Sequence, residues 1–248
     1  MAVVTGAAAG IGQAIAQSLA DAGYALALID LADTRVVAGD AGLAFAGDVS
    51  DADDVARFAA AVEERFGRVD VLVNNAGISS IGPAEDLELD VWRRVLAVNL
   101  TGPFALAQAF GRMMLAAGSG SIVNVASIAG LRGVSDRAAY NASKHGLIGL
   151  TRTLAAEWGG RGVRVNAVCP GWVKTPMDVA DQAAGGYDDA DIEHQVPMGR
   201  FAAPQDIAAA VRFLADPATA GFVNGVALPV DGGWIADASW TSLRLRKR

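Results

Sequence analysis

The sequence TGAAAGIG at residues 5–12 follows an apolar segment of strand length and leads into a segment of helical period. Glycines in such a turn let the backbone approach a pyrophosphate, and the helix N-terminus adds N–H donors and a partial positive charge. The spacing G-x-x-x-G-x-G differs by one residue from the G-x-G-x-x-G fingerprint, so alone it is a weak indication of dinucleotide binding. Its position between a strand and a helix favours a phosphate-binding turn, with Gly6, Gly10 and Gly12 against the ligand.

On both sides of this turn, apolar segments of strand length alternate with longer segments of helical period. Strands that are apolar along their whole length are buried on both faces, as in a parallel sheet, and their alternation with helices predicts a doubly wound fold. No internal repeat or linker interrupts the pattern, so we expect one α/β domain over residues 1–248 with a seven-stranded, Rossmann-type parallel sheet. The expected strands are residues 3–5, 25–30, 43–46, 71–74, 121–125, 163–169 and 227–230. The expected helices are residues 11–22, 52–66, a long stretch within 91–117, 140–158 and 204–214.

One connection is too short for a full crossover helix. Only residues 31–42 separate the second and third expected strands, and Gly39 and Gly42 shorten any helix further. We therefore expect a loop or a single helical turn there.

The charge balance and the length of the apolar segments limit the possible partners. The net charge is −7, which argues against a nucleic-acid or anionic-membrane surface. No apolar segment reaches the length of a membrane span, and the start MAVVTG lacks a signal-peptide pattern, so a cytoplasmic protein is expected. Cys169, the single cysteine, lies in an apolar segment and is expected to be a small buried side chain.

Asp30 ends the second expected strand and predicts the type of cofactor. A carboxylate at this position accepts hydrogen bonds from the ribose hydroxyls of NAD and repels the 2′-phosphate of NADP. Ala9 occupies the loop position from which an arginine would reach that phosphate, and Arg35 is the nearest cation. We therefore predict NAD as the cofactor. The alternative for Asp30 is a cap of the strand end.

Two other strand ends carry polar residues. Asp48 follows the third strand and is expected to contact the adenine; alternatively it is an N-cap or a turn residue before the next helix. The sequence NNAG at residues 74–77 follows the fourth strand, where Gly77 lets the chain pass close to a ribose and the amides brace the backbone. A simple turn is the alternative for this tetrapeptide.

Tyr140 and Lys144 open a helix at positions i and i+4 and so share one face. A free phenol titrates too high to act as a base at neutral pH, but a nearby ammonium and an oxidised nicotinamide favour the phenolate. Tyr140 is thus a candidate general acid and base. Alone, such a pair would more often be a surface contact.

Two further residues make a catalytic set. Ser127 ends the fifth strand, so its hydroxyl is expected at the carboxyl edge of the sheet, where it can hydrogen-bond a carbonyl oxygen and stabilise a developing alkoxide. Asn99 lies in mid-helix, where Asn is a poor helix former. Its amide is expected to bind a water that leads from Lys144 to bulk solvent; the alternative is a helix kink with a satisfied side chain.

These motifs, together with PGWVKT at residues 170–175 and DGG at 231–233, resemble the short-chain dehydrogenase/reductase family in order and spacing over nearly the whole chain. The resemblance implies an oxidoreductase that moves a hydride between nicotinamide and a secondary alcohol or ketone, with no metal site. The catalytic set that it implies is Asn99, Ser127, Tyr140 and Lys144. The expected cofactor-binding residues are Gly6, Gly10, Ile11, Gly12, Asp30, Asp48, Val49, Asn75, Ala76, Gly77, Tyr140, Lys144, Pro170, Gly171, Val173 and Thr175.

In this family the segment after Thr175 is a mobile lid over the substrate, here residues 176–200 with a hinge expected at Gly185 and Gly186. Within it only His194 and Arg200 oppose the acidic side chains. If the carboxylates face the pocket, they disfavour an anionic substrate; alternatively they are solvated. The acidic residues of the lid are Asp178, Asp181, Asp188, Asp189, Asp191 and Glu193.

A small neutral polyol or sugar-like substrate is therefore expected. The alternative is reduction of a 3-oxoacyl thioester on an acyl carrier protein, which typically uses NADPH and a basic docking patch, and Arg132 near the site keeps it open. A non-catalytic dinucleotide sensor is the alternative from a different class, and the complete catalytic set argues against it.

The tail at residues 234–248 is rich in apolar and basic side chains. Too few residues remain for another packed layer, so a subunit interface is expected to bury it, or else its basic cluster is a solvated terminus. The resemblance implies a homotetramer with an interface built from the helices that contain Asn99 and Tyr140. The tail residues concerned are Trp234, Ile235, Trp240, Leu243, Arg244, Arg246, Lys247 and Arg248.

Overall fold

A computed structural model describes residues 1–185 and 187–239 and has a single parallel sheet at its centre. The strand order β3-β2-β1-β4-β5-β6-β7 reverses at β1, from which the chain proceeds first to one side and then to the other. This is the doubly wound topology that the sequence predicts, and the expected strands are confirmed to within two residues at each end. The strands are β1 Ala2–Thr5, β2 Leu26–Asp30, β3 Leu43–Ala46, β4 Val71–Asn74, β5 Gly120–Val125, β6 Val163–Pro170 and β7 Ala227–Val230.

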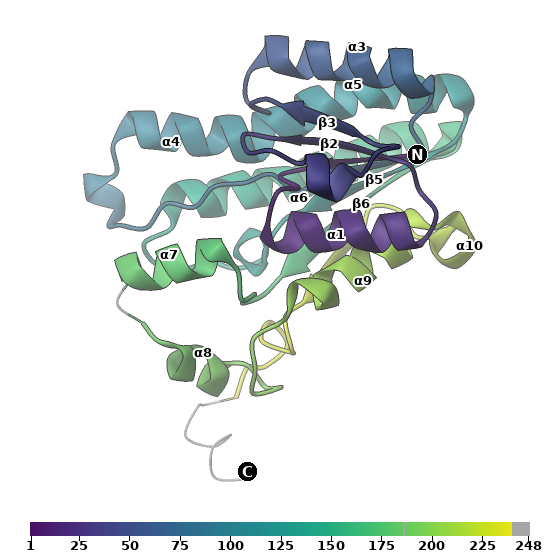
Figure 1. Cartoon of the computed structure of the whole chain (residues 1–248). Coiled ribbons are helices and arrows are strands. Elements are labelled where there is room, and N and C mark those ends of the chain that lie inside the picture. The colour runs from purple at the N-terminus through teal and green to yellow at the C-terminus, as the bar shows by residue number, and fades with distance from the viewer. Residues whose placement is uncertain (186, 240–248) are drawn as a thin grey trace.

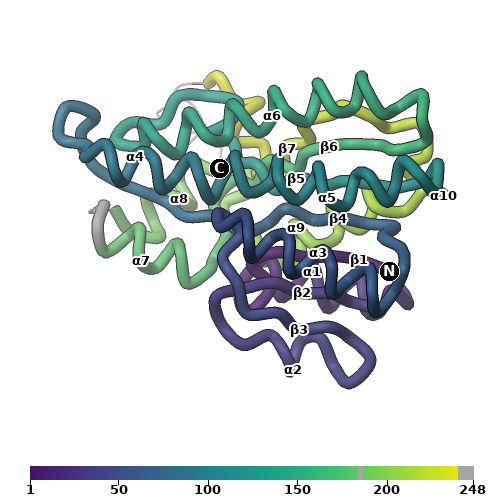
Figure 2. The backbone as a smooth tube through the Cα atoms, turned by 90° about the horizontal axis from the view of Figure 1, so that it is seen from above, coloured from purple at the N-terminus to yellow at the C-terminus, as the bar shows by residue number. Residues whose placement is uncertain are grey.

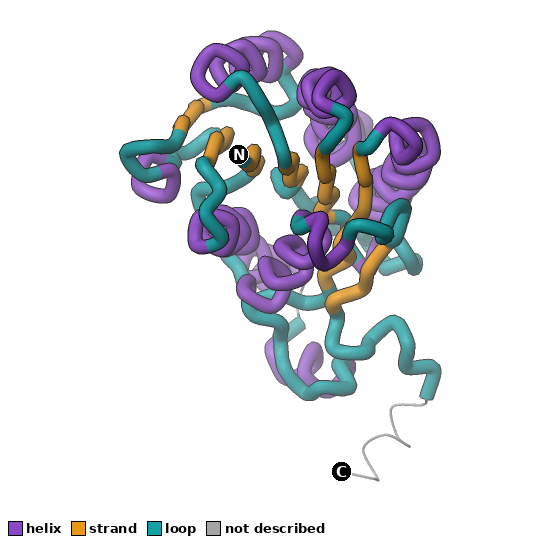
Figure 3. The backbone as a smooth tube through the Cα atoms, turned by 90° about the vertical axis from the view of Figure 1, so that its right-hand side faces the viewer, coloured by secondary structure: helices purple, strands orange, loops and turns teal. Residues whose placement is uncertain are grey.

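Helices cover both faces of the sheet (Figures 1 and 3). On one face, α1 (Gly10–Asp21) and α9 (Pro204–Ala215) pack against each other and on the strands. On the other face lie α3 (Ala52–Phe66), α5 (Gly102–Ala117) and α6 (Ala138–Trp158). Alternate residues of one strand enter opposite cores, since Val4 packs with the first layer and Val3 with the second. Both faces of the sheet are therefore dry, as the apolar strands predict.

The expected long helix within 91–117 is a compound one. It begins as α4 (Leu89–Leu96), passes through a π-helical turn (Ala97–Thr101) and continues as α5. Seen from above in Figure 2, α4 runs beside α6, with which it makes contacts. The short connection after β2 contains only α2 (Arg35–Ala38), so the expected single turn is confirmed.

The remaining helices are short. In the lid, α7 (Pro176–Gly185) and α8 (Asp189–Gln195) lie near the end of the molecule where the strands finish (Figure 1). Gly185 ends α7, whereas Gly186, the second expected hinge residue, lies outside the described residues. The other short helices are α10 (Pro217–Ala220) and 3-10 turns at Ala84–Asp86, Ile128–Gly130 and Gly159–Arg161. Across the described residues, no helix has the length and apolar character that a membrane crossing requires.

A buried chain of amides fixes α6 to the sheet. Asn74 donates to Asn124 Oδ1 at 2.8 Å, and Asn124 donates to Thr151 Oγ1 of α6 at 2.9 Å. Because buried polar groups need partners, this chain allows little sliding of the helix along the sheet. It thereby holds the N-terminal part of α6, which carries Tyr140 and Lys144, in place.

Candidate active site

A cavity of about 490 Å³ opens at the carboxyl edge of the sheet, where the strand order reverses. This is the position at which open α/β sheets bind ligands. All the predicted cofactor-binding residues line it, and so does Ser127. Of the predicted catalytic set, Asn99 does not line the cavity but lies behind its wall.

The glycine turn has the geometry of an anion site. Gly6 and Gly10 have φ values of +64° and +56°, a region that L side chains rarely adopt. A side chain at Gly12 would begin 2.0 Å from the carbonyl oxygen of Gly6, so only glycine fits. No side chain caps α1 at Ala9, and no acidic residue lies in its first turn. The uncapped N-terminus therefore faces the cavity, and these residues fit a cofactor pyrophosphate.

Asn75 holds this turn in position. Its side-chain amide donates to the carbonyl oxygens of Thr5 and Gly6, both at 3.0 Å. In return, the Thr5 hydroxyl accepts from the backbone N–H groups of Asn75 and Ala76 at 3.0 and 2.9 Å. The predicted bracing by the NNAG amides is thus present, and the Asn75 side-chain N–H groups are used within the protein.

At the other end of the cavity, Asp30 is fixed at the end of β2. Its carboxylate accepts from the backbone N–H of Ala8 at 2.9 Å and from that of Ala32 at 3.0 Å. The side chain thus ties the strand end to the glycine turn while it lines the cavity. Asp30 can therefore cap the strand end and still present its carboxylate to a ligand in the cavity.

Asp48 is a turn residue, and the helix N-cap that we weighed for it is wrong. The N-cap of α3 is Asp51, whereas Asp48 accepts from the backbone and hydroxyl of Ser50 and from Arg94 at 2.8 Å. Burial opposes ionisation, but the hydrogen bonds from Ser50 and Arg94 hold the pKa of the Asp48 carboxyl below its usual range. Sequence reasoning missed Arg94, which lines the cavity beside this carboxylate.

Lys144 is a buried ammonium group, with 4% of the residue exposed. Its Nζ donates to the carbonyl oxygen of Val125 at 2.9 Å and lies 5.6 Å from the centre of the Tyr140 ring. Burial lowers the pKa of Lys144 to about 8, because the charged form loses water. The pair predicted from i, i+4 spacing is therefore inside the cavity and is not a surface contact.

The Tyr140 phenol differs from the expectation. Burial raises the pKa of the phenol above its usual range, while a hydrogen bond from Ser127 and the charge of Arg137 act to lower it. Lys144 is not among the groups that lower this pKa in the protein alone, where burial of the phenol has the larger effect. The prediction also invoked an oxidised nicotinamide, and the effect of that positive charge on the phenol stays a prediction.

Ser127 is 8% exposed and lies two residues after the end of β5, at the carboxyl edge of the sheet as predicted. Its hydroxyl oxygen accepts from the backbone N–H of Ala129 at 3.1 Å, which caps a 3-10 turn and fixes the side chain. With one lone pair used in this way, the hydroxyl proton is directed toward the Tyr140 phenol, and a ligand oxygen between the two side chains would receive it.

Asn99 lies in the π-helical turn, and its side chain is fully buried. Its amide donates to the carbonyl oxygen of Ile78 at 2.9 Å and to Ser143 Oγ at 3.1 Å, and it accepts from the N–H of Ile78 at 2.9 Å. Both N–H groups of the Asn99 amide are thus used within the protein. This is the alternative that we gave for Asn99, a distorted helix whose asparagine side chain has all its hydrogen bonds. A side chain at Gly77 would begin 3.3 Å from Asn99 Oδ1 and 3.6 Å from Lys144 Nζ, which places Asn99 behind the lysine.

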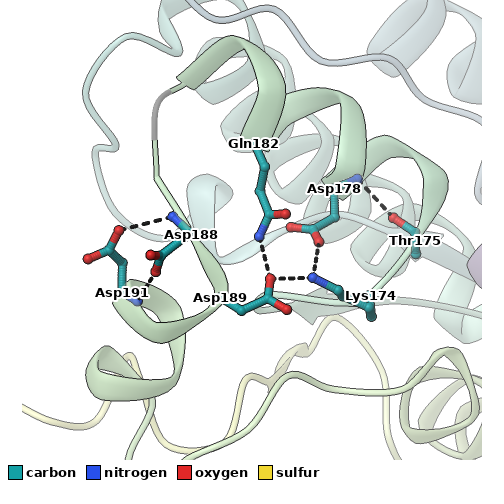
Figure 4. Close-up of polar contacts among 7 residues, drawn as sticks. All are labelled: Lys174, Thr175, Asp178, Gln182, Asp188, Asp189 and Asp191. Atoms are coloured by element: carbon teal, nitrogen blue, oxygen red, sulfur yellow. Dashed lines mark hydrogen bonds and ion pairs between the residues drawn. The ribbon is translucent and has the colours of Figure 1, made fainter.

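The acidic lid is neutralised in part by bases outside it. Figure 4 shows Lys174 between Asp178 of α7 and Asp189 of α8, with Gln182 bound to the same Asp189. Asp181 pairs with Arg137 at 2.8 Å. Asp178 and Asp181 line the cavity, but each has a basic partner that the count within residues 176–200 left out.

Arg132 is not at the site, contrary to our expectation. Its guanidinium lies over the ring of Trp234 and bonds to the carbonyl oxygen of Ile235, and the residue does not line the cavity. Arg137, three residues before Tyr140, lines the cavity, as Arg94 and Lys144 do. Its position before the helix was the only available signal for it in the sequence.

Lys144→Met tests the burial of this ammonium without a ligand. Since the folded-state pKa is depressed, the cost of burying the charge is present below about pH 8 and disappears as pH rises toward 10.5. The free energy of unfolding of the variant should therefore exceed that of the wild type by about 1–3 kcal/mol at pH 7. This difference should shrink toward pH 10. Urea unfolding across this pH range measures both.

Lys174→Met is the matched control, because hydrogen bonding to Asp189 raises the pKa of this exposed lysine. It should not stabilise the protein at pH 7. A destabilised Lys144→Met protein, or a pH-independent difference, would contradict the burial argument.

Comparison with known proteins places these features in one family. The sequence profile of a family described as enoyl-(acyl carrier protein) reductase matches residues 6–235. D-threitol dehydrogenase of Mycolicibacterium smegmatis is 46% identical, with 94% of this chain and 92% of the relative covered. Galactitol 2-dehydrogenase (L-tagatose-forming) of Cereibacter sphaeroides is 43% identical, with 94% of each chain covered.

A solved structure of a variant of actinorhodin polyketide ketoreductase with NADPH has the same fold. It superposes with a TM-score of 0.89 at 37% identity, and the match covers 94% of this chain and 96% of the other. The protein therefore belongs to the short-chain dehydrogenase/reductase family and is an oxidoreductase that uses a nicotinamide dinucleotide and acts on a secondary alcohol or the corresponding ketone.

Proposed function

We propose that the protein oxidises a secondary hydroxyl of a small neutral polyol or sugar-like substrate with NAD⁺ and catalyses the reverse reduction with NADH. The observation that carries the proposal is the single cavity wall that joins the glycine turn and Asp30 to Ser127, Tyr140 and Lys144. The names of the threitol and galactitol dehydrogenases among its relatives support a polyol.

The preference for NAD rests on the charges near Asp30. Arg35, the nearest cation in sequence, pairs with Asp33 at 2.7 Å on the surface. Among the described residues that line the cavity, the basic ones are Arg94, Arg137 and Lys144. Arg94 is paired with Asp48, so a 2′-phosphate beside Asp30 would meet a carboxylate and no free cation. The ketoreductase structure contains NADPH, so the cofactor preference differs among proteins of this fold and must be measured for this protein directly.

Each side chain of the catalytic set has one task. Tyr140 takes the proton of the substrate hydroxyl during oxidation and returns it during reduction. Ser127 donates a hydrogen bond to the same oxygen, and Lys144, held against Val125, supplies positive charge beside the phenol. Asn99 positions Ser143 and the Ile78 backbone behind Lys144. A bound nicotinamide dinucleotide supplies the hydride acceptor or donor.

A second candidate is reduction of a 3-oxoacyl thioester with NADPH. A 3-oxoacyl-[acyl-carrier-protein] reductase of Synechocystis is among the relatives at 36% identity, and the matching family is also described by a reduction on an acyl carrier protein, although of an enoyl group. Against it, Arg132 is engaged by Trp234 and Ile235, which removes the one basic residue that we expected at the site. A non-catalytic sensor would not need the buried Lys144 beside Tyr140.

We further propose a cytoplasmic homotetramer. Phe104 of α5 is 46% exposed and Phe222 is fully exposed on the single chain, so apolar surface is available for an interface. The part of the expected interface tail at residues 240–248 lies outside the described residues.

Tyr140→Phe should abolish proton transfer while it keeps the shape of the cavity. Turnover should fall at least ~100-fold, because the ring remains and the acid–base group is lost. NADH binding, measured by fluorescence titration, should stay within about threefold of the wild type. Retained turnover would contradict the role of the phenol.

Asp30→Ser tests the cofactor preference. The wild type should reduce NAD⁺ with a polyol such as threitol faster than NADP⁺, and the variant should shift the ratio of kcat/KM toward NADP⁺ by ~10-fold or more. The increase in absorbance of the reduced nicotinamide measures both rates. Asp40→Ser is the control, since Asp40 is exposed in the same connection and does not line the cavity. A wild type that uses only NADP⁺, or reduces only 3-oxoacyl thioesters, would favour the second candidate.

A further inference from the structure

The cavity is also lined by four polar side chains that the catalytic set does not include. They are Arg137 from the segment before α6, Trp172 after β6, Asp181 from α7, and Tyr187 between the lid helices. They come from segments far apart in the sequence, and two of them belong to the lid.

Arg137 and Asp181 form a largely buried ion pair. The N–O distance is 2.8 Å, and the two side chains are 9% and 17% exposed. Arg137 also donates to the hydroxyl of Ser79 at 2.7 Å. Both bonds use Nη1, so other N–H groups of the guanidinium remain as donors, and the second oxygen of Asp181 remains as an acceptor. The pair therefore offers both kinds of hydrogen-bonding group at no net charge.

Trp172 and Tyr187 add two polar atoms without partners. Among the described residues, Nε1 of Trp172 is buried and makes no hydrogen bond, and the buried hydroxyl of Tyr187 has no partner within hydrogen-bond geometry, although the nearby Arg137 guanidinium acts to lower the pKa of this phenol. The two rings pack edge to face with centroids 5.5 Å apart, which fixes both atoms. A buried donor without a partner costs free energy, so a ligand that satisfies it gains binding energy.

The two pairs lie close to each other and to the reacting phenol. All five side chains line the same cavity, and the charges of Arg137 and Asp181 act on the phenols of both Tyr187 and Tyr140. A substrate whose oxygen meets Tyr140 can therefore extend its next carbons toward these four side chains.

We propose that Arg137, Trp172, Asp181 and Tyr187 form a subsite that binds the hydroxyl groups of a polyol remote from the oxidised carbon. Each such hydroxyl both donates and accepts, which matches the mixture of donors and the acceptor found here. A carboxylate at the same position would meet Asp181, so the subsite selects a polyol against a hydroxy acid. This inference rests on the proposed function and names four specificity residues for it.

Three four-carbon substrates test the subsite: threitol, 2-butanol, which lacks the remote hydroxyls, and 3-hydroxybutyrate, which carries a carboxylate. Tyr187→Phe keeps the ring contact and should lower the ratio of kcat/KM for threitol over 2-butanol by ~3–10-fold. Asp181→Asn is nearly isosteric and should lower this ratio by ~10-fold or more. It should also raise the ratio for 3-hydroxybutyrate over threitol by ~10-fold, since Arg137 is then free to bind an anion.

Glu193→Gln is the matched control, because it removes an exposed lid carboxylate that does not line the cavity. Its ratios should stay within about twofold of the wild type. Unchanged ratios in Tyr187→Phe and Asp181→Asn, or equal shifts in the control, would overturn the subsite. Polyol oxidation by the wild type would in that case still support the proposed function. A wild type that oxidises 2-butanol but no polyol would overturn both. If Asp181→Asn does not fold, Tyr187→Phe decides the question.

Discussion

The cross-tie between Thr5 and the Asn75–Ala76 backbone is the constraint on which the site depends. It joins the ends of β1 and β4 where the two halves of the sheet part, and the Asn75 amide returns two bonds to the glycine turn. The turn is thereby held open with an uncapped helix N-terminus toward the cavity. A ligand phosphate then finds donors that need no rearrangement, which is the condition for tight binding of an anion at a helix N-terminus.

The catalytic end is built on groups that folding alone would not favour. Lys144 is buried without a carboxylate partner among the residues described, and the π-helical turn around Asn99 departs from regular helix. Both features are stabilised from outside: α6 by the Asn74–Asn124–Thr151 chain, and the turn by Ile78 and Ser143. The arrangement is typical of a site that exchanges some stability for function.

The sequence predicted the sheet, the short connection after β2 and most of the residues around the cavity, because these depend on apolar periodicity and on glycines at positions whose backbone conformation or spacing excludes other residues. It did not predict Arg94, Arg137 or Tyr187 in the cavity wall, since their positions depend on how distant segments pack. The same limit explains the error on Arg132 and the basic partners of the lid that the sequence did not show. Local sequence gives charges, whereas the pairing of Asp181 with Arg137 and of Asp178 with Lys174 is a tertiary property.

The central claim is that the cavity transfers a hydride directly between a secondary carbinol carbon and the nicotinamide. Threitol labelled with deuterium at the carbinol carbons, incubated with the protein and NAD⁺, tests it most directly by NMR of the reduced nicotinamide. The account predicts deuterium at one face of the nicotinamide C4 and none in the water. Label released to solvent, or reduced cofactor without label, would contradict it.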